Sequence, residues 1–336
     1  MTTIFDVAKL AGVGIGSVSR VINSKGSVSD KTKLKINKAI KALNYKPNHA
    51  ARSLVSKEFN TIGVLGAELA GTFKSETLRV IDHELITYGK HCLVTNGGSN
   101  NSENPNAAID SVNDLISKGC DGIIFWGNDI THFDITYVEK YFPNIVILND
   151  RIENFDLKCF YFNHYKAGYI AGQHLVDNGH KSIACITGDF QTKDGQKRHE
   201  GFLDSLKDNN ITIPSEFIVE GDYSFIKGQE GVLTLLKRNL DFTALFCGND
   251  RSAMAAISTL SSNGFNVPGD ISVLGYDDHD MAPFTSPPLS TIRVPFDDMA
   301  LAGVRYLLNT CYDLQLSVER NFPVELIERK SVRNLT

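Results

Sequence analysis

The chain has 336 residues, of which 42% are hydrophobic and 22% charged, a balance typical of folded globular domains rather than of disordered chains. Its six cysteines are scattered without CxxC spacing, and no secretory leader or apolar run of about 18 residues is present. These features exclude a disulfide scaffold and a membrane span. We expect a reduced, cytoplasmic protein that has no membrane partner.

Charge is distributed unevenly along the chain. Residues 1–60 hold eleven Lys and Arg against three Asp and Glu, a net charge of +8, whereas the whole chain carries −5 and residues 61–336 therefore −13. A small basic segment before an acidic body is typical of a protein whose first part alone contacts a polyanion. We therefore expect residues 1–60 to face nucleic acid.

Two short helical patterns stand at the start of the chain. Thr3 offers an N-cap to the first pattern, Asp6 an acid in its first turn, and Gly12 suits the left-handed residue that ends it. Apolar residues three and four positions apart predict that the two helices pack together. These residues are Val7, Ala8, Ala11, Val18, Val21 and Ile22.

The second helical pattern leaves polar and small residues on its outer face. Ile15, Gly16, Ser17 and Arg20 would there meet base edges and phosphates in a major groove. On periodicity alone, part of a larger core is the better explanation of the two helices. The local basic charge favours DNA binding, as does a third helix expected over residues 29–43. Its expected inward residues are Leu34, Ile36, Ile40 and Leu43, and its lysine face holds Lys31, Lys35 and Lys38.

From residue 61 onward, short β-branched runs alternate with amphipathic helical patterns, which indicates parallel sheets with helices on both faces. About 275 residues are too many for one core and favour two lobes. The runs cover residues 61–66, 92–97, 122–127, 145–150, 160–163, 182–188, 217–221, 244–250 and 271–278. Near 158–164 and near 289 one strand follows another without a good helix, so we expect the chain to cross between lobes there.

Polar residues follow many of these strands, at the edge where parallel sheets bind ligands. Amide and carboxylate oxygens together with aromatic faces suit a polyhydroxylated ligand. For any one residue, a strand-end turn or a helix cap is at least as good an explanation. The polar candidates are Asn96, Asn149, Asp150, Asp189, Asn249, Asp250, Asp277 and Asp278, and the aromatic candidates are Phe73, Trp126 and Phe160.

Several segments together carry a resemblance to a known family. TIFDVAKLAGV, SVSRVIN, the helix from 30 to 43 and NYKPNHAARSL resemble the head and hinge of LacI/GalR-family transcriptional repressors, and the similarity continues to the C-terminus. CLVTNG, the segment NPNAAIDSVNDLISKGCDGIIF and the C-terminal half look closest to the galactose-repressor branch. The resemblance implies an N-terminal all-α helix-turn-helix head and an α/β body of two doubly wound parallel-sheet lobes, similar to periplasmic binding proteins.

The resemblance and the strand pattern together give expected domain boundaries. The helix-turn-helix head would cover residues 1–46, and the hinge helix with its linker residues 47–60. The N-terminal lobe would combine 61–158 with 291–318, and the C-terminal lobe 159–290 with 319–336.

The family's DNA contacts, carried over by position, fall on two segments. In the head they are Thr3, Ile15, Gly16, Ser17, Arg20 and Asn23, and in the hinge Asn48, Ala51 and Leu54. The resemblance implies that Leu54 wedges between base pairs from the minor groove, although packing on the body is the alternative. Gly14 stands where the family commonly has a capping serine, and Gly16 removes a side chain from a reading position.

The resemblance also implies an effector site between the lobes. Its expected residues are Phe73, Asn149, Asp150, Arg198, Asn249 and Asp277. Arg198 matches an arginine three positions before a glycine, here Gly201. FNH at 162–164 departs from the family pattern, and the choice between Asn149, Asp150 and Arg151 as the residue facing the cleft stays open.

We therefore expect a repressor of carbohydrate-utilisation genes that binds double-stranded operator DNA as a homodimer and responds to a small, sugar-like effector, most simply a monosaccharide. Alternatives are a purine- or nucleoside-responsive repressor and, in another class, a solute-binding protein. We expect no enzymatic activity, cofactor or metal. A dinucleotide loop at Gly12 to Gly16 fails at Ser17, and the acids around His279 (Asp277, Asp278 and Asp280) are interpreted as a solvated loop.

Overall fold

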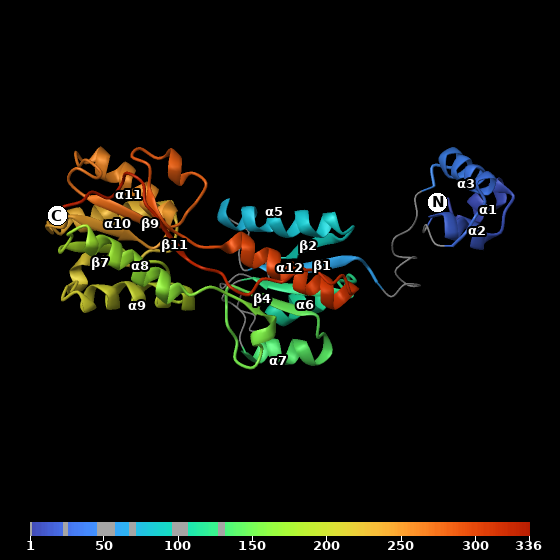
Figure 1. Cartoon of the computed structure of the whole chain (residues 1–336), viewed down its shortest axis with the longest axis horizontal. Coiled ribbons are helices and arrows are strands. Elements are labelled where there is room, and N and C mark those ends of the chain that lie inside the picture. The colour runs from blue at the N-terminus through green and yellow to red at the C-terminus, as the bar shows by residue number, and fades with distance from the viewer. Residues whose placement is uncertain (1, 23–25, 46–57, 67–71, 96–106, 127–131) are drawn as a thin grey trace. The chain divides into compact units, whose positions relative to one another are not determined.

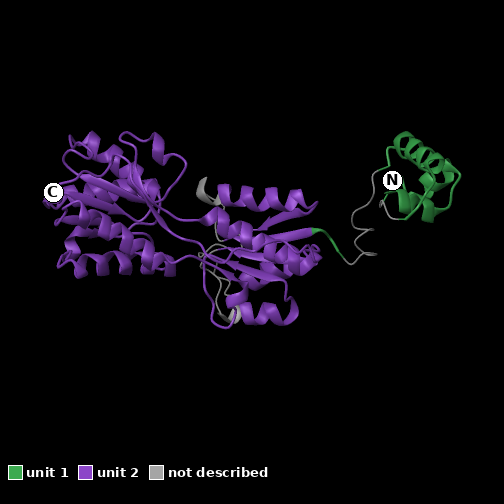
Figure 2. Ribbon diagram, viewed as in Figure 1, with its two compact units in different colours: residues 1–60 green, residues 61–336 purple. Residues whose placement is uncertain are grey.

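The computed structural model describes the chain except for residues 1, 23–25, 46–57, 67–71, 96–106 and 127–131 and the side chains of 72–74 and 132–134. The chain forms two compact units, residues 1–60 and residues 61–336 (Figure 2). The first holds only helices in its described part, and the second holds two sheets covered by helices (Figure 1). The expected fold class is confirmed.

The first unit contains α1 (Ile4–Ala11), α2 (Ile15–Ile22) and α3 (Asp30–Ala42). Thr3 and Asp6 form a reciprocal capping box, with the Thr3 backbone N–H donating to the Asp6 carboxylate over 2.8 Å. Gly12 ends α1 in the left-handed region at φ +66°, where a side chain would be strained. These local signals fix where α1 starts and stops, as the sequence predicts.

The three helices share a small apolar core. Its buried residues are Val7, Ala8, Ala11, Val18, Ile36 and Ala39. The inward placement of Leu34 is wrong, because its side chain is 60% exposed. Leu34 lies two positions before Ile36, which is more than half a helical turn away, so α3 cannot bury both.

The first sheet of the second unit has the order β2-β1-β3-β4-β5, all parallel. Its strands are β1 (Thr61–Gly66), β2 (His91–Thr95), β3 (Gly122–Trp126), β4 (Ile145–Leu148) and β5 (Cys159–Phe160). Side chains alternate between two cores: Ile62 and Val64 pack under α5 (Thr72–Thr87) and α12 (Phe296–Tyr312). Leu65 packs under α6 (Ala107–Ser117) and α7 (His132–Tyr141) on the opposite face.

The second sheet has the order β11-β10-β9-β8-β6-β7, parallel except for the antiparallel β11. One face is covered by α8 (His164–Asp177) and α9 (Lys193–Asp208), the other by α10 (Phe225–Lys237) and α11 (Asp250–Ser262). The strands are β6 (Ile183–Ile186), β7 (Ile218–Val219), β8 (Ala244–Cys247), β9 (Ser272–Asp277), β10 (Ser290–Arg293) and β11 (Glu325–Ile327). Short 3-10 turns lie at η1 (Asp156–Lys158), η2 (Ser215–Phe217) and η3 (Ala282–Phe284).

The chain passes between the two lobes three times, after β5, after β10 and before β11. Each passage lies a few residues later than the expected boundaries. Cys159 and Phe160 still pair with the first sheet, Thr291 to Arg293 still pair with the second, and Arg320 still bonds to the carbonyls of Leu157 and Cys159. Where two strands follow one another, the alternation of apolar and polar residues does not change at the point where the chain leaves one sheet for the other. The sequence therefore locates the boundaries between the lobes only to within a few residues.

Candidate functional site

The outer face of α2 is open to solvent as the sequence predicts. Ile15 is 41% exposed, Gly16 and Arg20 are also exposed, and Ser17 is half-buried. Val18 on the opposite face is fully buried and anchors α2 against the core of the unit. The lysines of α3, Lys31, Lys35 and Lys38, are exposed as well. Asn23, Asn48, Ala51 and Leu54 lie outside the described residues.

In the second unit, a polar cluster gathers where β6, β8 and β9 end. Its centre is Arg198 of α9, whose side chain is only 4% exposed. The guanidinium carbon lies 3.7 Å from the ring centroid of Tyr276 and 5.3 Å from that of Tyr223, and Nη2 lies 3.6 Å from the Asp194 carboxylate. Nη1 donates to the Gly248 carbonyl. Nε is buried without a partner among the described residues, so one donor is left for a ligand.

Arg198 reaches this position because α8 and α9 pack backbone to backbone. A Cβ at Gly201 would collide with the Tyr165 carbonyl, and one at Gly168 with the Arg198 carbonyl. Only glycine permits so close an approach. The spacing of Arg198 and Gly201, found in the sequence, thus has a packing cause.

Asp277 ends β9 beside this cluster, with a backbone φ of +118°, a region that favours glycine. Burial raises the pKa of its carboxyl to about 7, although the charge of Arg198 acts to lower it. The carboxyl of Asp277 is therefore close to half-protonated near neutral pH.

His164, the first residue of α8, joins the cluster, although the sequence analysis did not select it as a site residue. Its Nδ1 lies 3.0 Å from the Tyr276 hydroxyl, and its Nε2 lies 2.9 Å from the Asn149 Oδ1. Burial first, and then the charge of Arg198, lower the pKa of His164 to about 3, so the ring is neutral. The only sequence signal was the FNH departure at 162–164.

Contacts show which of the residues after β4 reach the other lobe. Asn149 meets His164, and the Asp150 Oδ2 lies 2.9 Å from the Lys193 Nζ at the start of α9. Arg151 instead pairs with Asp156 of its own lobe over 2.7 Å. Asn149 and Asp150 both contact the second lobe.

The remaining candidates are placed differently. Asn249 is buried and caps α11 through Ser252 N–H, while its amide donates to the Tyr223 carbonyl, so it positions the Tyr223 loop. Asp250 turns inward to the Thr291 hydroxyl and the His279 N–H.

Two aromatic candidates and one turn residue are explained by packing and local structure. Trp126 and Phe160 are buried in the core rather than presented to a ligand, with Arg320 lying 4.0 Å over the Phe160 ring. The carboxylate of Asp189 accepts from the Gln191 N–H, as in a strand-end turn. The side chain of Phe73 and all of Asn96 lie outside the described part of the chain.

The prediction of a solvated loop around His279 is also wrong. His279 is 7% exposed, and the buried Asp278 carboxylate lies 2.7 Å from Arg293 and 2.6 Å from Arg329. The sequence shows several acids close together around His279, but it does not show that arginines from other segments lie beside them. The prediction of a solvated loop was wrong for this reason.

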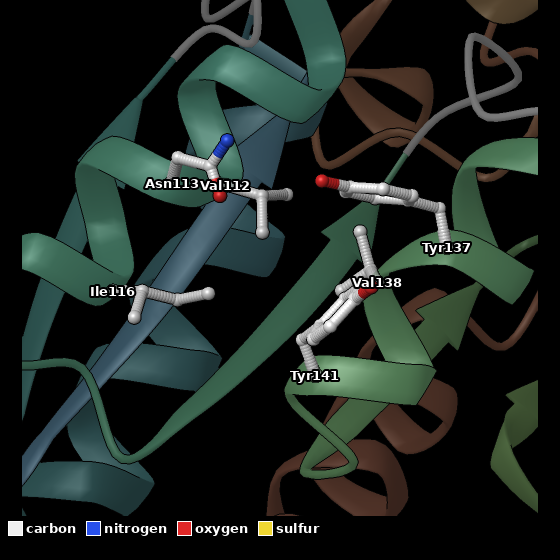
Figure 3. A pocket seen from close by; sticks show the side chains of 6 residues that line it. All are labelled: Val112, Asn113, Ile116, Tyr137, Val138 and Tyr141. Atoms are coloured by element: carbon white, nitrogen blue, oxygen red, sulfur yellow. The ribbon is translucent and has the colours of Figure 1, made fainter.

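A separate hollow of about 100 Å³ lies between α6 and α7, away from the Arg198 cluster (Figure 3). Its lining side chains are all uncharged: Val112, Asn113, Ile116, Tyr137, Val138 and Tyr141. It offers an amide and two hydroxyls but no charged group, whereas the Arg198 cluster combines a buried cation with carboxylates, so the cluster is the better candidate site.

Comparison with known proteins agrees with this geometry. Residues 3–48 match the family described as bacterial regulatory proteins, lacI family, and residues 173–332 match the periplasmic binding protein-like domain. The HTH-type transcriptional repressor PurR of Mannheimia succiniciproducens is 32% identical over 338 residues, covering all of both chains. The chain belongs to the LacI family. It is therefore a DNA-binding transcriptional regulator with an effector-binding body.

Other LacI-family members match along the whole chain. The regulator GalR of Escherichia coli is 29% identical, covering 99% of this chain and 96% of its own length. The lac repressor dimer, solved with operator and the anti-inducer ONPF, is 29% identical with a TM-score of 0.87, covering 99% of each chain. GalR and PurR match at similar identity, so the galactose branch stays a prediction.

These relatives are regulators and not enzymes. No helix in the described part of this LacI-family chain is long and apolar enough to cross a bilayer.

Proposed function

We propose that this LacI-family regulator represses carbohydrate-utilisation genes as a homodimer and that a sugar-like effector controls it by binding at the Arg198 cluster. The observation that carries this proposal is Arg198 itself, a buried guanidinium with an unpartnered Nε, next to the carboxyls of Asp194 and Asp277. Donors and acceptors placed this closely suit the adjacent hydroxyls of a sugar.

We infer that the contacts to operator DNA come from the exposed face of α2 and from Thr3, at the start of α1. Ile15, Gly16 and Arg20 support this by their exposure on α2, and Ser17 is half-buried beside them. Asn23 and the hinge residues Asn48, Ala51 and Leu54 stay part of the proposal on the family resemblance alone. The lac repressor, solved as a dimer on its operator, supports the homodimer.

The second candidate effector is a purine or nucleoside, favoured by the match to PurR. A purine base needs a flat apolar surface for its ring as well as hydrogen bonds. The rings of Tyr223 and Tyr276 already have the Arg198 guanidinium over them, and the His164 ring lies parallel to that of Tyr276 with both nitrogens in contact with side chains. This arrangement favours the sugar. The match of residues 3–48 to the lacI family removes the solute-binding alternative.

A thermal-shift screen of the full chain against monosaccharides, purines and nucleosides distinguishes these candidates. A ligand present at 100 times its dissociation constant adds about 2.7 kcal/mol to the free energy of unfolding. We expect a monosaccharide to raise the Tm of the wild type and to leave the Tm of Arg198→Met unchanged. A shift with purines alone would replace the sugar proposal by the purine one.

A further inference from the structure

The first residue of the second unit is held by hydrogen bonds that lead to the end of α12. Thr61 begins β1 and directly follows the first unit, which ends at residue 60. Its N–H donates to the Asp121 Oδ2 over 3.2 Å, and its carbonyl accepts from the Asp121 N–H over 2.7 Å. The Tyr312 hydroxyl donates to the same Oδ2 over 2.7 Å. We call Thr61, Asp121 and Tyr312 the Asp121 clasp.

Two further contacts hold the end of α12 at the clasp. The Lys90 Nζ lies 3.4 Å from the ring centroid of Tyr312, and the Cys311 thiol donates to the Asp121 carbonyl over 3.3 Å. Neither contact involves the Tyr312 hydroxyl. The change Tyr312→Phe therefore removes one charge-assisted hydrogen bond and leaves the ring under Lys90.

The other end of α12 is attached to the second lobe. The strand β10 of the second sheet ends at Arg293, and α12 begins at Phe296, only two residues later. The buried ring of Phe296 meets that of Phe162 edge-on, with 4.9 Å between the centroids. Phe162 lies 4.3 Å from the ring of His164, which contacts Asn149 across the lobes. A movement of the second lobe therefore acts directly on the start of α12.

Between its two ends, α12 is closely packed on the first sheet (Figure 1). Its 17 residues span about 25 Å. A Cβ at Gly303 would lie 2.7 Å from a methyl carbon of Leu148 on β4, so the helix lies close against this strand. A helix packed this densely has no free space in which to bend, so a shift at its start reaches Tyr312. Its fully buried side chains are Met299, Ala300, Val304, Leu307 and Leu308.

We propose that α12 couples the contact between the lobes at His164 to Thr61 through the Asp121 clasp, and that Tyr312 is the positioning residue of this coupling. The chain leaves the body at Thr61 for the segment that carries the DNA-binding helices. A shift of α12 therefore shifts the start of that segment. The inference rests on the proposed function, because it supplies a route by which an effector at the Arg198 cluster changes operator binding.

The test perturbs one end of α12 and measures the other end, in the full-length chain without effector or DNA. Phe162→Leu weakens the contact with Phe296, and residue-resolved hydrogen exchange reports on the amides of Thr61 and Asp121. We expect this variant to speed their exchange by roughly 2- to 30-fold, which corresponds to about 0.5–2 kcal/mol of coupling. In the Tyr312→Phe background, the same change should have no further effect on these two amides.

Matched variants separate coupling from loss of packing. Phe202→Leu removes the same volume from a fully buried ring that stacks on Phe246 in the second lobe, and it should leave the amides of Thr61 and Asp121 as in the wild type. Tyr306→Phe removes a hydroxyl of α12 outside the clasp and should keep the full response to Phe162→Leu. Phe296→Leu changes the Phe162 contact from the side of α12 and should reproduce the effect of Phe162→Leu.

Three results would overturn this proposal. One is unchanged exchange of the Thr61 and Asp121 amides in both Phe162→Leu and Phe296→Leu. Another is the same acceleration with and without the Tyr312 hydroxyl. The third is an equal acceleration at the Val273 amide, which donates to the Ser331 carbonyl in the second lobe, because this would show a general loosening of the chain. Since no effector or DNA is added, failure here is distinguishable from failure of the proposed function.

Discussion

The Nε2 of His164 lies 2.9 Å from the Oδ1 of Asn149 and thereby joins the second lobe to the first. The Nδ1 of the same ring contacts the Tyr276 hydroxyl, and the Arg198 guanidinium lies over the ring of Tyr276. The proposed effector site and a contact between the lobes are therefore parts of one network. A ligand that moves Arg198 would act directly on how the lobes are joined.

His164 should make stability depend on pH. The pKa of its buried ring is about 3 in the folded chain against about 6.5 in the unfolded chain. Between these values the unfolded state binds more protons. The free energy of unfolding therefore falls as pH drops below about 6.5, by at most about 1.4 kcal/mol per pH unit. Urea unfolding at pH 7 and pH 5 should show a smaller fall for His164→Gln than for the wild type, with the exposed His83→Gln as control. Equal falls in all three chains would contradict the buried neutral ring.

Asp277 should make effector affinity depend on pH near neutrality. Burial raises the pKa of its carboxyl to about 7, so ionisation of the carboxyl is completed only above that pH. Since the ionised form accepts hydrogen bonds from hydroxyls on both oxygens, affinity should rise between pH 6 and pH 8. Calorimetric titration should give a flat profile for Asp277→Asn and the wild-type profile for the exposed Asp241→Asn. A wild type without pH dependence would argue against a role for this carboxyl.

The same pKa shift has the opposite sign for stability. Because the pKa of Asp277 is raised on folding, the folded state binds more protons between about pH 4 and pH 7. This group therefore lowers the free energy of unfolding as pH rises through that range. Its effect opposes that of His164, so each slope has to be measured as a difference between the wild type and a single variant.

Gly201→Ala should destabilise the second unit. The added methyl would collide with the Tyr165 carbonyl and force α8 and α9 apart, at a cost of about 1–3 kcal/mol. Gly66→Ala is the matched control, because its Cβ would lie 3.8 Å from the Trp126 carbonyl oxygen, an ordinary contact. Urea denaturation of both variants measures the difference in their unfolding midpoints. A Gly201→Ala variant with the wild-type midpoint would show that stability does not depend on the close packing of α8 against α9.

Arg20→Ala should weaken operator binding and lower its salt dependence. An exposed arginine on α2 that contacts a phosphate releases counterions, so its loss should reduce the log–log salt slope by about 1. Fluorescence anisotropy with labelled operator, selected in vitro from random DNA, measures both quantities. Lys207→Ala, which removes an exposed charge from the body, should bind as the wild type. An unchanged slope for Arg20→Ala would remove this residue from the interface.

The elements of the fold follow from local sequence signals. The capping box of Thr3 and Asp6 lies within four residues, and most strands of the parallel sheets are short apolar runs. Such signals are present in the sequence itself. Arg198 was selected as a site residue because the family resemblance implies an arginine three positions before a glycine, here Gly201.

The contacts that shape the candidate site join residues far apart in the sequence. His164 meets Tyr276, 112 positions later, and the pair of Asp150 and Lys193 depends on how the two lobes fold together. Neither pairing leaves a periodic pattern in the sequence.

The most direct measurement is a titration of the protein–operator complex with the effector found in the thermal-shift screen. We predict that saturating effector changes the operator affinity of the wild type by roughly 5- to 150-fold. Arg198→Met and Asp277→Asn should bind operator as tightly as the wild type without effector. When effector is added, Arg198→Met should show no change and Asp277→Asn a reduced one. A full response in both variants would place the effector site elsewhere and contradict the proposed control through the Arg198 cluster.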